Sequence, residues 1–309
     1  MAGIKITGYG CAHGDRTVTN EELARVVDSS DAWIRSRTGI ESRYFADNRS
    51  NLDMACEAAE MALQRWGGDR GAVDLLLVCT FTPDLATPSV ACGAAGRLGL
   101  SQKVMCLDIN GACSGFVYGC TLAHAMLTAG DARCALVIGS EKISPLMDLT
   151  ERGSAILFGD GAGAVVLEAD GTKEFASYSD CIPESETLFC ERFDPAIMMK
   201  GQEVYRFAVN AVPESIYGVL RRAGRRVEDV DWFICHQANL RILRSVAGKL
   251  DVGMEHFYVN IQRYGNTSAA SVAICLSEML EKGLLKSGQR VVITGFGAGL
   301  TCGSILLTV

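Results

Sequence analysis

The sequence predicts an α/β protein that consists of two similar halves. Short apolar runs typical of buried strands alternate along the 309 residues with segments of helical periodicity. Two strand-like segments also recur at one offset: Asp74 and Asp231 are 157 positions apart, and so are Arg133 and Arg290. Two matches with the same offset indicate a duplicated unit. Two equivalent halves around a pseudo-twofold axis would hold a functional site between them.

The composition fits a folded protein with a large core. Hydrophobic residues make up 49% of the chain and charged residues 21%, and the length of 309 residues suggests two domains or one large duplicated unit. No apolar segment reaches the roughly 18 residues of a membrane span, and the N-terminus lacks the pattern of a signal peptide. The expected location is therefore the cytoplasm. A net charge of −7 argues against a general nucleic-acid binder.

Four elements are expected in the first third of the chain. The apolar run Ile4–Tyr9 predicts a strand. A helix is expected near Asn20–Val27, because Thr19 or Asn20 can cap it and acidic residues fill its first turn. The spacing of apolar residues predicts a long helix over Asn51–Trp66. The apolar run Asp74–Thr80 predicts a buried strand.

Cys113 is the candidate nucleophile. It lies between a strand expected over Val104–Ile109 and a helix expected over Phe116–Thr128, so its thiol stands at a helix N-terminus. Unpaired N–H groups and the helix dipole favour a thiolate at that position. The other twelve cysteines are scattered and suggest neither a disulfide framework nor a metal site, so most are expected to be buried and reduced. The alternative for Cys113 is an inert thiol, because burial raises the pKa of cysteine.

The second half supplies possible partners for a thiol. His236 follows a strand expected over Trp232–Cys235, at the end where α/β sheets collect ligand-facing residues. Asn266 stands before another predicted helix. Histidine can transfer a proton, and asparagine adds a hydrogen-bond donor without charge. A purely structural role stays open for both, and the glycine-rich runs Gly159–Gly163 and Gly295–Gly299 are either turns or loops that approach a ligand.

Five motifs resemble β-ketoacyl-acyl-carrier-protein synthase III in their order and spacing, within a likeness that runs from Ile4 to Leu307. The motifs are Ser30–Gly39, Asn110–Phe116, Phe158–Gly163, His236–Arg241 and Gly265–Ser271. Because several long motifs agree at once, the resemblance is specific.

The resemblance implies a thiolase fold with five layers in the order α-β-α-β-α and two similar halves, over residues 1–168 and 169–309. Cys113 in the first half and His236 and Asn266 in the second match the family's catalytic triad. The implied enzyme is an acyltransferase, usually a homodimer, that starts fatty-acid synthesis. An acyl group moves from acyl-CoA to Cys113, malonyl-acyl-carrier protein loses carbon dioxide, and the carbanion attacks the acyl thioester to give a 3-oxoacyl-carrier protein. Acyl-CoA is a substrate, and the resemblance implies no metal, no permanently bound cofactor and no nucleic-acid or membrane partner.

The resemblance also assigns supporting residues. Backbone N–H groups of Cys113, Ala298 and Gly299 would form the oxyanion hole, although family members often carry glycine in place of Ala298. Residues that match contacts to coenzyme A are Trp33, Arg37, Arg152, Tyr205 and Asn239. Residues that match the carrier-protein surface are Arg206, Gln237, Ala238, Asn239, Leu240, Arg241 and Lys249.

The primer pocket would involve Thr87 and Phe296. A bulky aromatic at the first of these positions restricts family members to short primers. Thr87 is smaller, so the sequence predicts a roomier pocket that accepts branched or longer acyl groups.

Other classes of function stay open. A related acyltransferase of specialised metabolism could form the same acyl-Cys113 and pass the acyl group to a different nucleophile, but Asn266 argues against it because a His and Asn donor pair serves decarboxylation. A catalytically silent scaffold is disfavoured by the intact triad. A standard thiolase would need a second catalytic cysteine near the last glycine loop, whereas Cys302 lies in an apolar, strand-like run.

Overall fold

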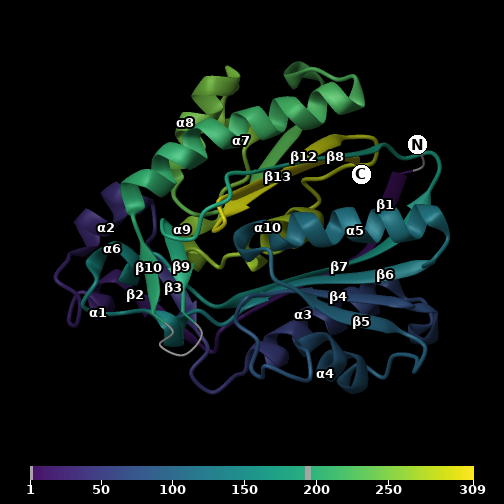
Figure 1. Ribbon diagram of the computed structural model, residues 1–309, viewed down its shortest axis with the longest axis horizontal. Helices are drawn as coiled ribbons and strands as arrows, with labels where there is room; N and C mark the ends of the chain where they lie inside the picture. Colours follow the sequence, from purple (N-terminus) through teal and green to yellow (C-terminus); the bar gives the residue numbers. More distant parts are fainter. Residues whose placement is uncertain (1–2, 192–195) are drawn as a thin grey trace.

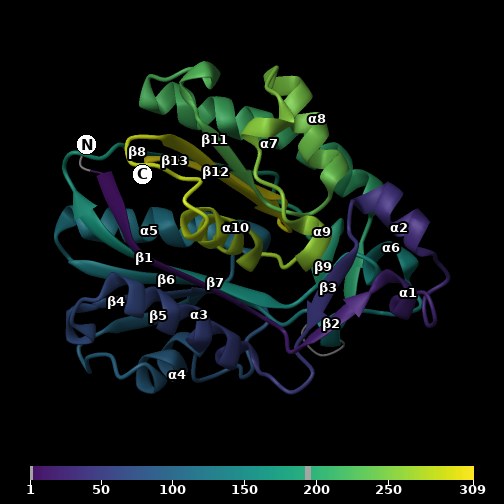
Figure 2. The same ribbon diagram turned by 180° about the vertical axis from the view of Figure 1, so that it is seen from behind.

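Five layers make up the computed structural model, which describes residues 3–191 and 196–309. Two sheets alternate with three helical layers in the order α-β-α-β-α (Figures 1 and 2). Strand order in the first sheet is β1-β7-β6-β4-β5, and in the second β11-β12-β13-β8. The first sheet contains β1 (Gly3–His13), β4 (Leu75–Cys79), β5 (Met105–Ile109), β6 (Cys134–Glu141) and β7 (Gly161–Asp170); the second contains β8 (Phe175–Cys181), β11 (Trp232–Cys235), β12 (Arg290–Gly297) and β13 (Thr301–Thr308).

The helices that cover the sheets come from both halves of the chain. The long helices α3 (Asn51–Trp66) and α7 (Gly201–Ala223) lie in the outer layers, with α4 (Val90–Arg97) and α8 (Leu240–Leu250). The central layer, between the sheets, contains α5 (Gly115–Ala129) and α10 (Ala270–Glu281). The remaining elements are β2 (Arg16–Thr19), β3 (Ser42–Phe45), β9 (Leu188–Cys190), β10 (Ile197–Met199), α1 (Asn20–Leu23), α2 (Asp31–Thr38), α6 (Arg152–Ala155) and α9 (Ile261–Tyr264).

The pairing of the strands confirms the internal duplication. In the first sheet β4 pairs in parallel with β6, β6 is antiparallel to β7, and β7 to β1; in the second β11, β12, β13 and β8 repeat this pattern. The aspartates of the repeat act alike. The Asp74 carboxylate accepts a hydrogen bond from the backbone N–H of Arg133, and that of Asp231 accepts one from Arg290. The sheets divide close to residues 168 and 169, since β7 ends at Asp170 and β8 begins at Phe175.

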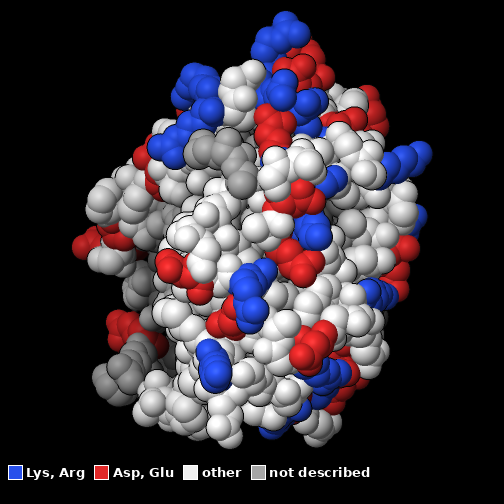
Figure 3. Space-filling view, turned by 90° about the vertical axis from the view of Figure 1, so that its right-hand side faces the viewer, with Lys and Arg blue, Asp and Glu red and all other residues white. Residues whose placement is uncertain are grey.

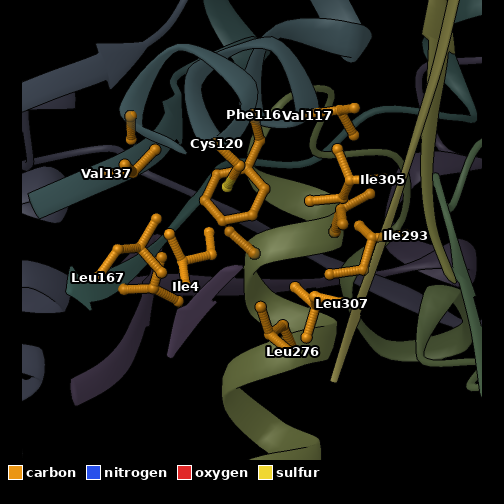
Figure 4. Close-up of a cluster of buried hydrophobic side chains, with 14 of the residues drawn as sticks. Ile4, Phe116, Val117, Cys120, Val137, Leu167, Leu276, Ile293, Ile305 and Leu307 are labelled. Atoms are coloured by element: carbon orange, nitrogen blue, oxygen red, sulfur yellow. The ribbon is translucent and has the colours of Figure 1, made fainter. Parts of the chain in front are cut away.

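Burial between layers explains why these sequences form strands. Every residue of β4 and β6 is buried, as expected for strands with helices on both faces. Side chains of the central layer join the two sheets into one core. Figure 4 shows Phe116 and Cys120 of α5 between Val137 and Leu167 of the first sheet and Ile305 of the second. The two halves therefore share their largest apolar cluster.

The run Gly159–Gly163 serves packing. A Cβ atom on Gly163 would lie 2.5 Å from the carbonyl carbon of Ala273, and one on Gly159 would lie 2.3 Å from the carbonyl oxygen of Tyr264. Glycine at these positions lets β7 lie against α10 and the preceding turn against α9. This run is therefore a packing feature of the sheet, one of the two alternatives left open by the sequence.

The helix predicted over Asn20–Val27 is too long. Thr19 caps it as expected, because its hydroxyl accepts a hydrogen bond from the backbone N–H of Glu22, but α1 ends at Leu23. The chain then continues in turns, with backbone bonds over three residues at Arg25 and Val26, and Val27 is buried while Val26 is exposed. Two successive β-branched residues followed by Asp28, Ser29 and Ser30 favour a turn over further helix. Among the described residues, no helix combines the length and the apolar character that crossing a membrane requires.

Candidate active site

Cys113 lies at the head of α5, as the sequence predicts. It belongs to a 3₁₀ turn, Ala112–Ser114, that connects β5 to α5. Ala112 has a left-handed φ of 45°, which is costly for a residue with a Cβ atom and turns the chain sharply before the helix. A Cβ atom on Gly297 would lie 3.0 Å from the Cys113 sulfur. The second glycine-rich run therefore approaches the nucleophile directly, and only glycine fits at position 297.

The resting state of Cys113 differs from the expected thiolate. Burial raises the pKa of its thiol to about 12, and the nearby charge of Glu141 raises it further, while an interaction with Ser268 lowers it. Loss of water around the sulfur thus outweighs the stabilisation that a helix N-terminus offers. The raised pKa favours a neutral thiol in the free protein over the thiolate expected from the helix N-terminus.

His236 directly follows β11, and burial favours its neutral imidazole. Its ring is 1% exposed and meets the ring of Phe296 edge-on, with centroids 5.0 Å apart. Burial lowers the pKa of His236 to about 3. Its Nδ1 atom lies 2.7 Å from the hydroxyl of Ser271, which also accepts the backbone N–H of Gln237. Because a hydroxyl can donate or accept, Ser271 can hold either tautomer of the ring.

Asn266 presents an amide donor to the cavity that His236 also lines. Its Oδ1 atom accepts a hydrogen bond of 2.9 Å from the backbone N–H of Ser268, which fixes the orientation of the amide and leaves the NH₂ group available. The backbone of Asn266 bridges to Phe158 and donates to the carbonyl of Leu157. Asn266 therefore has both roles considered from the sequence: it forms a local turn and it faces a cavity.

One cavity of about 860 Å³ contains all three predicted catalytic residues in its lining. Cys113, His236 and Asn266 lie at its inner end with Gly297. At its outer end it reaches exposed Arg37 and Arg241, so it connects the thiol to the surface. A thiol, a neutral imidazole and a neutral amide around one space can bind a thioester and donate hydrogen bonds to its oxygen.

The residues predicted to contact coenzyme A gather at the outer end of this cavity. The guanidinium of Arg152 lies 4.6 Å from the centre of the Trp33 ring, and that of Arg37 lies 5.9 Å from it. Tyr205 and Asn239 line the same cavity. Asn239 also caps α8 by accepting the backbone N–H of Arg241 and donates to the carbonyl of Arg37. An aromatic ring with two cations close to it suits a nucleotide with phosphate groups.

The predicted carrier-protein residues fall into two groups. Arg206, Arg241 and Lys249 are exposed on α7 and α8, and Ala238 and Leu240 are half-buried nearby. Gln237 does not belong with them, because its side chain is 1% exposed and bonds the carbonyl of Cys235 and the N–H groups that follow Val259. The Gln237 amide lies in the interior because backbone groups of two neighbouring segments satisfy both its N–H and its oxygen.

The two predicted primer-pocket residues lie apart from each other. Thr87 lines a surface groove of about 1100 Å³ that does not include Cys113. Phe296 lies under His236 in the large cavity. A separate cavity of about 160 Å³ lies beside Cys113 and is lined by Phe81, Leu188, Phe189, Ile197, Ser268 and Ala298, among others. Within one chain, neither Thr87 nor Phe296 lines this smaller cavity.

Glu141, at the end of β6, is a residue that the sequence reasoning missed. Its carboxylate is fully buried and accepts hydrogen bonds from the hydroxyls of Thr82 and Thr80, at 2.6 and 3.0 Å, and from the backbone N–H of Phe81. Its Oε1 atom has no hydrogen-bond partner among the described residues. Burial raises the pKa of Glu141 to about 7. No motif marks this residue, since only the fold brings it near Cys113.

Glu141→Gln is expected to remove a pH-dependent part of the stability. The folded pKa, about 7, exceeds the ordinary value of 4.5, so Glu141 stabilises the fold below about pH 4.5 and this contribution is lost as the pH rises through 7. The difference corresponds to roughly 3 kcal/mol. Between about pH 5 and about pH 8, wild type should lose several degrees of melting temperature more than the variant. Exposed Glu255→Gln is the control, and equal pH dependence in wild type and Glu141→Gln would contradict the expectation.

Among the described residues, no group of three or more histidine, cysteine or acidic side chains is placed to hold a metal ion. Comparison with known proteins identifies the family. Residues 107–181 match the family described as 3-oxoacyl-[acyl-carrier-protein] synthase III, and residues 220–309 match its C-terminal region. The β-ketoacyl-[acyl-carrier-protein] synthase III of Clostridium novyi is 39% identical, over 99% of both chains. The chain belongs to the β-ketoacyl-[acyl-carrier-protein] synthase III family.

Other members of the synthase III family agree in sequence and structure. The protein of Acholeplasma laidlawii is 41% identical, over 99% of this chain and 98% of its own. The crystal structure of the synthase III from Aquifex aeolicus superposes with a TM-score of 0.96 at 39% identity, over 99% of this chain and 100% of that chain. The predicted thiolase fold and the predicted class of enzyme, a condensing acyltransferase, are thereby confirmed.

Proposed function

We propose that this synthase III condenses an acyl group from acyl-CoA with malonyl-acyl-carrier protein, using Cys113 as the acyl carrier and His236 and Asn266 as hydrogen-bond donors. The observation that carries the proposal is that these three side chains, from distant segments of the chain, line one cavity. No permanently bound cofactor, metal or nucleic acid enters the scheme.

Acyl transfer comes first. The Cys113 sulfur attacks the thioester carbon of acyl-CoA, a new S–C bond forms, and coenzyme A leaves with the proton. Because the thiol and His236 are both neutral at rest, the imidazole is free to accept the thiol proton during attack. Negative charge develops on the oxygen of the acyl group. This oxyanion accepts hydrogen bonds from the backbone N–H of Cys113 and from N–H groups of the loop that contains Ala298 and Gly299.

Decarboxylation and condensation follow. Loss of carbon dioxide from the malonyl group leaves an enolate, and its thioester oxygen accepts hydrogen bonds from Nε2–H of His236 and the amide of Asn266. For His236 to donate from Nε2, its Nδ1 atom must accept, and the Ser271 hydroxyl at 2.7 Å can supply that proton. The enolate carbon attacks acyl-Cys113, the S–C bond breaks, and the 3-oxoacyl-carrier protein departs.

The test combines acyl-CoA, malonyl-acyl-carrier protein and the purified protein. The proposal requires equal amounts of carbon dioxide and 3-oxoacyl-carrier protein, with an acylated Cys113 peptide when the malonyl substrate is left out. An acylated Cys113 without any release of carbon dioxide would instead favour an acyltransferase with a different acceptor.

The rim of the large cavity supports the proposed sites for coenzyme A and the carrier protein. Arg37 and Arg152 flank Trp33 for the nucleotide end, while Arg206, Arg241 and Lys249 form a basic surface on the adjoining helices. The far end of the molecule, near the chain termini, carries interspersed acidic and basic side chains (Figure 3). On a chain with net charge −7, a local basic rim would steer an acidic partner to the cavity.

Charge reversal on this rim is expected to weaken chiefly the binding of the carrier protein. Arg241→Glu with Lys249→Glu should raise the KM for malonyl-acyl-carrier protein about tenfold and reduce its salt dependence, and it should raise the KM for acyl-CoA by less. Initial rates at several salt concentrations measure the KM and its salt dependence. Lys286→Glu, an exposed site in the loop before β12, is the matched control. Equal effects of the control and the rim variant would contradict a local docking surface.

The small cavity beside Cys113 supports a primer of limited size. An engineered apolar cavity of about 150 Å³ accommodates benzene, so 160 Å³ suits an acyl chain of about four to six carbons. Acylation rates across a series of acyl-CoA lengths should therefore peak at short branched or medium chains. Phe81→Ala, which enlarges the cavity, should shift the optimum to longer chains. A reaction restricted to acetyl-CoA in both proteins would contradict the proposed pocket.

We further propose a homodimer and a cytoplasmic location. The edge strand β5 leaves backbone groups unpaired, and Met105 on it is 53% exposed. Such an edge is a surface through which two sheets can join. Joining there would bring the groove that contains Thr87 against a second copy, where Thr87 could complete the partner's primer pocket.

A further inference from the structure

Two hydroxyl groups tie the loop between β12 and β13 to the residue next to the nucleophile. The Thr301 hydroxyl donates to the carbonyl oxygen of Ala298 at 3.0 Å, and the Ser114 hydroxyl lies 3.0 Å from that of Thr301. Ser114 directly follows Cys113 and is fully buried. A short polar chain thus connects the start of α5 to the loop over Cys113.

The number of protons fixes the direction of these bonds. Ala298 offers a carbonyl, which can only accept, so the single hydroxyl proton of Thr301 is used there. Thr301 must therefore accept from Ser114, and Ser114 must donate its own proton to Thr301. With Thr301 donating to Ala298, the chain runs from Ser114 to Thr301 to Ala298, and the Tyr118 side chain interacts with both hydroxyls. Loss of the middle hydroxyl removes the bond that holds the Ala298 carbonyl.

The carbonyl groups of this loop accept hydrogen bonds within the protein, whereas two of its N–H groups stay available to bind a ligand. Besides the bond to Ala298, the carbonyl of Gly299 accepts the backbone N–H of Glu184 at 2.8 Å, and that of Leu300 accepts Ile182 at 2.9 Å. Within the described part of the chain, the N–H groups of Ala298 and Gly299 donate to no recorded acceptor. Free N–H groups beside a nucleophile are the feature that an oxyanion hole requires.

Thr301 sets the plane of one of these peptides. A peptide group is planar and trans, so fixing the Ala298 carbonyl toward Thr301 directs the N–H of Gly299 to the opposite side. Gly299 itself has a φ of 125°, a conformation that favours glycine, so this residue has no side chain to hold its peptide groups in place. Its orientation depends on the groups that bind its carbonyls.

We infer that Thr301, supported by Ser114, is a positioning residue for acyl transfer: it fixes the loop N–H groups against Cys113. The inference rests on the proposed function, because it concerns the oxyanion of the acyl thioester. The enolate formed from the malonyl group is bound by His236 and Asn266 and does not depend on this loop. Loss of Thr301 should therefore slow one half of the reaction and spare the other.

The test uses Thr301→Val, which keeps the shape of the side chain and removes its hydroxyl. Acylation of Cys113 by acetyl-CoA and butyryl-CoA, followed by rapid quenching and intact mass, should slow about 10- to 100-fold. Decarboxylation of malonyl-acyl-carrier protein by the unacylated protein should stay within about twofold of wild type, because His236 and Asn266 are untouched. Thr301→Ser should restore acylation, and Ser114→Ala should slow it more mildly.

Ser304→Ala is the matched control. Ser304 lies on the same strand, is fully buried and bonds the hydroxyls of Ser215 and Thr294, on the other face of β13. It should leave acylation unchanged. Acylation of Thr301→Val at the wild-type rate, or equal losses of acylation and decarboxylation, would overturn the inference. If wild type took no acyl group from either CoA, the proposed function itself would fail, and the inference with it.

Discussion

Cys113→Ala is expected to abolish acylation and to lower condensation by roughly 10⁶-fold, the size of effect seen when the nucleophile of a catalytic unit is removed. The reason is chemical: among the described cysteines, only Cys113 lines the large cavity with His236 and Asn266, whereas Cys190 lines only the small one of these two cavities. Intact mass spectrometry after incubation with acyl-CoA should show one acyl group on wild type and none on the variant.

Two further measurements make this result specific. Cys92→Ala removes an exposed thiol on α4 that lines neither of these cavities, and it should be acylated like wild type. Cys113→Ala should still decarboxylate malonyl-acyl-carrier protein, because its donors for the enolate are intact. Acyl label that persists on Cys113→Ala would show that another residue carries the acyl group and would exclude the proposed mechanism.

His236→Ala and Asn266→Ala should each lower decarboxylation of malonyl-acyl-carrier protein by about 10²- to 10³-fold, the typical loss for one donor to a developing oxyanion. Asn266→Ala should leave acylation of Cys113 nearly unchanged, because the thiol proton does not pass through the amide. His256→Ala, at an exposed histidine, should change neither step. Release of carbon dioxide and mass of the acyl-protein measure the two steps separately.

The pH dependence adds a check on His236. Since burial lowers its pKa to about 3, the ring stays neutral well below the ordinary value of 6.5. Titration of His236 should therefore cause no fall in decarboxylation between about pH 8 and about pH 5. Unfolded His236 binds a proton there while folded His236 does not, so this residue destabilises the fold as the pH falls below 6.5. A decarboxylation rate that halves near pH 6.5 in wild type and loses this pH dependence in His236→Ala would contradict the neutral ring.

Local patterns predicted the elements that depend on local sequence. The limits of α3 and β11 agree with the predicted ranges, because strong periodicity and a bounded apolar run define them. The placement of Cys113 before α5 also follows from local order. The helix at Asn20 was overextended, because the competing turn at Asp28 to Ser30 carries a weaker signal than the cap.

Properties that depend on burial could not be predicted in the same way. The state of the Cys113 thiol, the interior position of Gln237 and the roles of Ser271 and Glu141 all follow from which surfaces meet across layers. Ser271 had a faint signal as the last residue of the motif that contains Asn266. Glu141 had none, because its neighbours Thr80 and Thr82 lie about 60 positions away in the sequence.

The central layer has a consequence for how the catalyst is held together. Cys113 stands at the head of α5 and Asn266 shortly before α10, and these two helices come from different halves. The helical layer that separates the two sheets thus also holds residues that line the large cavity. Neither half contains a working site, so the contact between them, rather than the short covalent connection from β7 to β8, decides whether chemistry is possible.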